Sequence, residues 1–192
     1  LLSDLESKVR KTLQIAQQGS RLRTGLSVAI LGQPNAGKSS LLNALAMKDR
    51  AIVTNIAGTT RDALEESILI DGMPLNIIDT AGVRETDDVI EQEGVKRAWQ
   101  QAQHADLVIW VIDASVEPTS SAALQQQLEA LKQRLNQQVP ILLVLNKIDL
   151  CPEIKITQQY EKLSAVALSA KPHTGLSQLK ATLLNHAGMH DQ

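Results

Sequence analysis

Apolar positions along the chain fall either into short continuous runs or into longer stretches with helical spacing. The continuous runs are typical of strands that are covered on both faces of a sheet. They lie at 26–31, where Ser27 is the single interruption, and at 107–112, 141–145 and 166–168. The stretches with an apolar residue at every third or fourth position predict helices. They lie at 39–47, 122–135 and 176–184. Strands that alternate with helices predict an α/β fold with a mostly parallel sheet and helices on both faces.

Two further short strands, at 67–70 and 75–78, flank the dipeptide Asp71-Gly72. Asp-Gly between two apolar runs is a strong signal for a tight hairpin turn. The sequence therefore predicts one antiparallel hairpin strand in the otherwise parallel sheet.

The first 20 residues predict a helix with one apolar side. That side carries Leu2, Leu5, Val9, Leu13 and Ala16. Such a stripe needs a partner surface, either on the same domain or on a domain outside this chain. Because the chain starts without Met, we expect a piece of a longer protein. We expect residues 1–20 to be the remnant of a helical domain, 21–188 to form one domain, and 189–192 to be a polar tail.

Composition argues against three classes: proteins that bind nucleic acid by charge alone, disulfide-bonded proteins and membrane-spanning proteins. A formal net charge of −2 and a sequence pI near 6.1 argue against a surface that binds nucleic acid by charge alone. A single cysteine excludes an internal disulfide and gives no sign of an oxidising compartment. The longest apolar run, 107–112, is far shorter than the about 20 residues that a membrane span needs. We therefore expect a cytoplasmic domain with no membrane contact.

The segment 32–39 reads Gly-Gln-Pro-Asn-Ala-Gly-Lys-Ser and fits the pattern G-x-x-x-x-G-K-[ST]. It follows a predicted strand and opens a predicted helix, which is the context of a phosphate-binding loop. In such a loop, backbone N–H groups and the helix N-terminus surround the phosphates. Lys38 would contact the β- and γ-phosphates, and the Ser39 hydroxyl would bind Mg²⁺. The alternative is a glycine-rich turn with no ligand.

Three shorter motifs follow later strands. They are Asp79-Thr80-Ala81-Gly82, Asn146-Lys147-Ile148-Asp149 and Ser169-Ala170-Lys171. The first can bind Mg²⁺ through its aspartate and a γ-phosphate through its glycine N–H. The carboxylate of Asp149 can accept two N–H groups of guanine that adenine does not present, and the third motif could contact the base from the other side. Each short motif alone is more often a turn or a helix cap. Together with the phosphate loop, they all fall at the carboxyl ends of strands, where such sheets bind ligands.

The order of these motifs resembles the translation-factor-related GTPases of the TrmE-Era-EngA-like group, whose fold is that of a P-loop NTPase. The segment 58–62, Gly-Thr-Thr-Arg-Asp, matches the remaining switch motif of that group. The segment 22–30 before the phosphate loop, and Glu91 together with 94–98, are similar to the MnmE (TrmE) family of bacterial tRNA-modification GTPases. The resemblance covers nearly the whole chain and implies a small-GTPase-like G domain over 21–188.

This resemblance implies hydrolysis of GTP to GDP and phosphate, with Mg²⁺ and K⁺ as cofactors. It also implies that two copies pair as a homodimer through their switch faces, in response to the bound nucleotide. In the full-length family, the domain serves the modification of the wobble uridine of tRNA, together with a flavin-dependent partner protein. Two alternatives stay open: a ribosome-assembly GTPase of the tandem-G-domain type, and a non-hydrolysing nucleotide-sensing scaffold.

The resemblance also implies individual site residues. The implied nucleotide contacts are Asn35, Ala36, Gly37, Lys38, Ser39, Ser40, Thr54, Asn55, Ile56, Ala57, Gly58, Thr59, Thr60, Asp79, Thr80, Ala81, Gly82, Asn146, Lys147, Asp149, Ser169, Ala170 and Lys171. The implied metal ligands are Ser39 and Thr60 for Mg²⁺, and Asn35, Thr54, Ile56 and Thr59 for K⁺.

Catalysis needs a group that orients the attacking water. Many small GTPases place a glutamine directly after D-x-x-G for this purpose, but this chain has Val83 there. The resemblance assigns the catalytic acid to Glu91, with Lys38 as the catalytic lysine. Arg61 and Arg84, both in predicted switch loops, are alternative groups that could neutralise charge between the phosphates.

Overall fold

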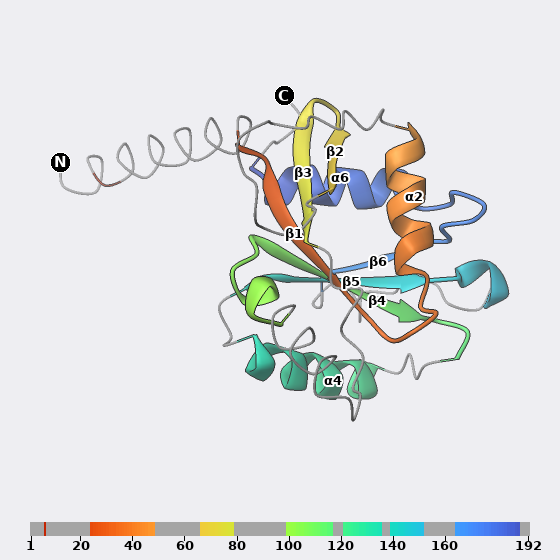
Figure 1. Ribbon diagram of the computed structural model, residues 1–192. Helices are drawn as coiled ribbons and strands as arrows, with labels where there is room; N and C mark the ends of the chain where they lie inside the picture. Colours follow the sequence, from red (N-terminus) through yellow and green to blue (C-terminus); the bar gives the residue numbers. More distant parts are fainter. Residues whose placement is uncertain are drawn as a thin grey trace, which may run out of the picture.

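The computed structural model describes residue 6 and the ranges 24–48, 66–78, 99–116, 121–135, 139–151 and 164–188. In this part of the chain six strands form one sheet in the order β2-β3-β1-β4-β5-β6 (Figure 1). The strands are β1 (Leu26–Leu31), β2 (Glu66–Ile70), β3 (Met73–Ile78), β4 (Leu107–Asp113), β5 (Ile141–Asn146) and β6 (Ala165–Ala167). The helical elements are α2 (Lys38–Lys48), α4 (Ser121–Arg134), α6 (Leu176–His186) and the 3₁₀ turn η1 (Ile148–Leu150). Residues 99–103 are also helical.

The sheet is parallel except at one edge. β2 and β3 are antiparallel, with Ile70 opposite Met73, and Asp71 and Gly72 join them with φ values of 48° and 84°. Positive φ at both central residues is what a tight two-residue hairpin turn requires. All other neighbouring strands pair in parallel, so the carboxyl ends of β1, β3, β4, β5 and β6 lie at one edge of the sheet.

Helices cover both faces of the sheet. On one face, Val28 of β1 lies in a buried cluster with Leu41 of α2 and Leu179 of α6. On the other face, Ala29 of β1 lies in a second cluster with Leu131 of α4. Figure 1 shows the same arrangement, with α2 and α6 on one side of the sheet and α4 on the other. Burying each large aliphatic side chain contributes about 1.5–3 kcal/mol, so these two clusters hold the layers together.

The predicted fold class is confirmed, and each predicted strand and helix from residue 26 onward is found within two residues of its predicted ends. β3 begins earlier than predicted, at Met73, because Met73 and Pro74 pair with β2. β6 ends before Leu168, because the following residue, Ser169, turns to pair with Thr174. Apart from Glu6, the predicted helix over 1–20 lies outside the described residues, and the domain boundaries stay a prediction. None of the helices that the structure describes is long and apolar enough to cross a membrane.

Candidate nucleotide-binding site

The phosphate-loop sequence connects β1 to α2 at the carboxyl edge of the sheet. Gly32 has a φ of 152°, and a Cβ there would lie 2.2 Å from the carbonyl oxygen of Val111 in β4. Gly37 has a φ of 96°, and a Cβ there would lie 2.2 Å from Nδ2 of Asn146 at the end of β5. Real Cβ atoms essentially never come closer than 3.0 Å to such neighbours. Gly32 is therefore required by the close approach of the β4 backbone, and Gly37 by the close approach of the Asn146 side chain.

Lys38 holds its ammonium group over this loop. Nζ of Lys38 donates to the carbonyl oxygens of Gly32, at 2.8 Å, and of Gln33, at 2.9 Å. Ser39 and Ser40 are exposed on the first turn of α2, where unpaired N–H groups and the helix dipole favour an anion. The structure thus brings the predicted phosphate-binding residues together at one junction of loop and helix. These residues are Asn35, Ala36, Gly37, Lys38, Ser39 and Ser40.

Asn146, the last residue of β5, joins three segments of the site. Its side chain is buried, with an exposed fraction of 1%. Nδ2 of Asn146 donates to the carbonyl oxygen of Ala36 at 2.8 Å, and Oδ1 accepts from the N–H of Ala170 at 3.2 Å. Only an amide side chain presents a donor and an acceptor in this way, so an aspartate could not replace it. The predicted base-recognition motif is thereby tied to the phosphate loop and to the loop after β6.

Asp149 and Ser169 lie against each other between the loops that follow β5 and β6. The hydroxyl of the buried Ser169 donates to Oδ1 of Asp149, whose side chain is otherwise exposed. Ser169 also pairs with Thr174 through two backbone hydrogen bonds of 2.9 and 3.1 Å, which closes the loop that carries the exposed Lys171. One hydrogen bond orients a carboxylate but leaves it the capacity for further donors. The Asp149 carboxylate can therefore still accept the two guanine N–H groups.

Asp113, the last residue of β4, contacts a residue of the predicted site and was not singled out by the sequence analysis. Its exposed fraction is 8%, and its Oδ2 lies 2.5 Å from Nζ of Lys147. Its Oδ1 accepts from the N–H of Ser115 at 3.0 Å and from the Ser115 hydroxyl at 2.5 Å. Burial alone would raise the pKa of this carboxyl, but the hydrogen bonds from Lys147 and Ser115 outweigh burial, and its pKa lies below its usual value. In the sequence, Asp113 differs from an ordinary strand end only in that it closes an apolar run, as Asn146 does, and this does not identify a site residue.

The other predicted site residues lie outside the described residues, and their roles stay predictions. They are Thr54, Asn55, Ile56, Ala57, Gly58, Thr59, Thr60, Asp79, Thr80, Ala81, Gly82 and Glu91, together with Arg61, Val83 and Arg84. The described part of the site therefore consists of the phosphate loop and of the two loops predicted to bind guanine.

A family model agrees with this geometry. The model described as "50S ribosome-binding GTPase" matches residues 27–147, which is more than half of the chain and includes the whole phosphate loop. The chain belongs to this family of GTPases. The family consists of GTP hydrolases, so the chain is a GTPase domain. That the described loops form its nucleotide site stays a prediction.

Curated relatives of this GTPase domain carry the name tRNA modification GTPase MnmE. The relative from Aromatoleum aromaticum is 43% identical over 189 residues, covering 98% of this chain and 41% of the relative. The relative from Mannheimia succiniciproducens is 47% identical over 187 residues, covering 97% of this chain and 41% of the relative. The predicted resemblance to the MnmE family is confirmed. The chain spans about two fifths of the length of these relatives.

Solved structures of other GTPase domains share the fold. The G domain of the T. maritima FeoB iron transporter matches with a TM-score of 0.58 and 29% identity, over 84% of this chain and 98% of that chain. A variant of Aquifex aeolicus Era, bound to GDP and AlF4⁻, matches with a TM-score of 0.59 and 30% identity, over 84% of this chain and 56% of that chain. These matches confirm the predicted P-loop GTPase fold.

Proposed function

We propose that this GTPase domain works with Mg²⁺ and K⁺ in a protein that modifies the wobble uridine of tRNA. The binding of a guanine nucleotide is supported by one observation above all. Asn146 joins the phosphate loop to the loop after β6 through two hydrogen bonds. These neighbouring segments would hold the phosphates and the guanine base of one nucleotide. The names of the relatives support the tRNA-modification part.

The residues of the site have separate tasks in this proposal. The backbone N–H groups of 32–39 and the ammonium of Lys38 would stabilise the negative charge that GDP gains as it leaves. Ser39 suits Mg²⁺, because its hydroxyl is a hard oxygen ligand exposed beside the phosphate loop, and Thr60 is the proposed second ligand. Bound there, Mg²⁺ neutralises phosphate charge. Asp149 would select guanine.

The K⁺ part rests on the family resemblance and on the position of Asn35. Asn35 is exposed on the phosphate loop in the left-handed region, with a φ of 64°. An amide oxygen there fits a large cation that needs several oxygen ligands. Thr54, Ile56 and Thr59 are the other proposed ligands. Such a cation would supply the positive charge that an arginine supplies in many other GTPases.

The proposed partners belong to the full-length protein. Two copies would pair as a homodimer through their switch faces when a transition-state-like nucleotide is bound. A flavin-dependent partner protein and tRNA would complete the assembly, and the proposed location is cytoplasmic. A ribosome-assembly role is an alternative from the sequence and agrees with the wording of the family description, whereas identities of 43–47% over nearly the whole chain favour the tRNA-modification role.

The cation requirement is testable by comparing GTP turnover in KCl and in NaCl at equal ionic strength. We expect turnover to be much faster in KCl, because a cage of oxygen ligands built for K⁺ cannot contract around the smaller Na⁺ without losing ligands. Asn35→Ala should remove this difference while leaving GDP binding nearly intact. The matched control is Asn43→Ala, which changes an exposed asparagine on α2 and should keep the difference between the two salts.

Equal turnover rates in KCl and NaCl would refute the role of K⁺ and favour Arg61 or Arg84. The complete absence of turnover in either salt would favour the nucleotide-sensing scaffold.

A further inference from the structure

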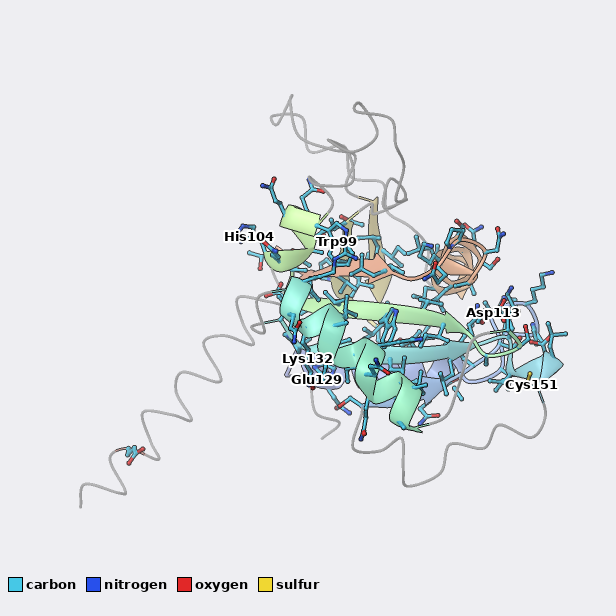
Figure 2. All side chains as sticks on the ribbon, turned by 90° about the horizontal axis from the view of Figure 1, so that it is seen from below. Trp99, His104, Asp113, Glu129, Lys132 and Cys151 are labelled. Atoms are coloured by element: carbon cyan, nitrogen blue, oxygen red, sulfur yellow. The ribbon has the colours of Figure 1, made fainter. Side chains whose placement is uncertain are left out.

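The ion pair between Asp113 and Lys147 has no task in the function proposed above. It joins the end of β4 to the residue after β5, and it is largely shielded from water, with side-chain exposures of 12% and 32%. Figure 2 shows Asp113 beside Cys151 at one end of the sheet, with His104 at the opposite end. The pair therefore lies at the carboxyl edge, where the nucleotide loops gather.

Lys147 connects this pair to the phosphate loop. Cε of Lys147 lies 4.0 Å from the position that a Cβ at Gly37 would take, so the stem of the side chain runs beside the loop backbone. The backbone of Lys147 is in the left-handed region, with a φ of 63°, and it starts the turn η1 that carries Asp149. A lysine in this conformation is uncommon and is maintained only where its surroundings hold it. One side chain thus runs beside the phosphate loop, while its backbone starts the turn that carries Asp149.

The ammonium group of Lys147 is held in one position by the carboxylate of Asp113. Nζ of Lys147 lies 2.5 Å from Oδ2 of Asp113, and the other oxygen of that carboxylate is held by Ser115. An ion pair of this kind, with its remaining oxygen hydrogen-bonded, holds both side chains in a single arrangement. Without the carboxylate, the flexible four-carbon stem of Lys147 would lose the interaction that keeps it beside Gly37.

We propose that Asp113 is a positioning residue of the guanine-nucleotide site, which acts by fixing Lys147 between the phosphate loop and the turn that carries Asp149. This inference rests on the proposed nucleotide site. Asp113 itself touches no nucleotide in this proposal. Asp113 keeps the site in the conformation that binds the nucleotide. Its substitution should therefore mainly raise the rate at which the nucleotide dissociates.

The test is the dissociation rate of a fluorescent GDP analogue, measured by stopped-flow displacement. Asp113→Asn keeps the shape of the side chain and an oxygen for Ser115 but removes the charge that holds Lys147. We expect dissociation to become about tenfold faster, because a charge-assisted hydrogen bond contributes at least about that factor. The matched control is Asp106→Asn at the opposite end of β4, where the carboxylate accepts from the N–H of Ser27 at 2.9 Å. This control should stay within about twofold of the wild type.

A double variant separates positioning from a general loss of stability. Lys147→Gln should speed dissociation at least as much as Asp113→Asn, because Lys147 is itself a predicted nucleotide contact. The double variant should be no faster than Lys147→Gln alone, because Asp113 acts only through Lys147. The proposal would be overturned if the two single effects on the dissociation rate multiply in the double variant, or if Asp113→Asn stays within twofold of the wild type.

If Asp113→Asn does not fold, Ser115→Ala takes its place and should speed dissociation a few-fold. An unchanged dissociation rate in Ser115→Ala would also overturn the proposal. A wild-type chain that binds no GDP would overturn the proposed nucleotide site itself.

Discussion

Asp149→Asn should lower the affinity for GDP by a factor on the order of 10² to 10⁴, because two charge-assisted hydrogen bonds of about 1.5–3 kcal/mol each are lost. The same variant should gain affinity for xanthosine diphosphate, whose extra carbonyl needs a donor where guanine needs an acceptor. The hydrogen bond from the Ser169 hydroxyl can be kept, since asparagine retains an oxygen that accepts. Calorimetric titration of both nucleotides measures the two effects.

The matched control for this substitution is Asp71→Asn. Asp71 is an exposed aspartate in the hairpin turn with a φ of 48°, a conformation that asparagine tolerates well. It should bind GDP like the wild type. Unchanged guanine selectivity in Asp149→Asn would show that the base is read elsewhere.

Glu91→Ala should lower GTP turnover about 10²-fold or more while GTP binding and pairing in K⁺ are retained. This expectation comes from the family resemblance, which places the catalytic acid at Glu91 in a chain that has Val83 where a glutamine is common. A carboxylate directly beside the γ-phosphate would be repelled, so we expect Glu91 to act through a bridging water. Single-turnover measurements in KCl with saturating enzyme report the chemical step separately from binding.

Neighbouring carboxylates provide the control for Glu91. Asp87→Ala and Asp88→Ala remove a charge from the same stretch of sequence and should stay within a few-fold of the wild type. If Glu91→Ala turns over normally in KCl, the attacking water is oriented by other groups. If all three variants lose turnover equally, the acidity of the whole segment matters rather than one catalytic acid.

The fold could be predicted because its strands are short and apolar and alternate with amphipathic helices. Strand ends could be predicted less closely, because they depend on pairing with neighbouring strands. Met73 and Pro74 belong to β3 only since they lie opposite β2, and Leu168 falls outside β6 since the chain turns at Ser169. Local sequence does not contain these tertiary contacts.

The loops of the site could be predicted from the sequence, but the hydrogen bonds and the ion pair between them could not. The motifs at 32–39 and 146–149 identified the loops, whereas the two hydrogen bonds of Asn146 depend on where the loop after β6 lies. The contact between Asp113 and Lys147 joins residues 34 positions apart in the sequence. It follows from the parallel register of β4 and β5, which sets Asp113 opposite Asn146. Because an aspartate after a strand is common, its sequence alone did not distinguish Asp113 from an ordinary strand end.

The central claim is that the phosphate loop and the two following loops form one site for a guanine nucleotide. Its most direct test is a pair of calorimetric titrations of the chain with GDP and with ADP, at equal concentrations and in the presence of Mg²⁺. The account predicts that one GDP binds per chain and that ADP does not bind at comparable concentration, since adenine lacks the adjacent N1–H and N2–H donors that guanine presents to Asp149. Equal affinities for GDP and ADP, or no binding of GDP, would contradict it.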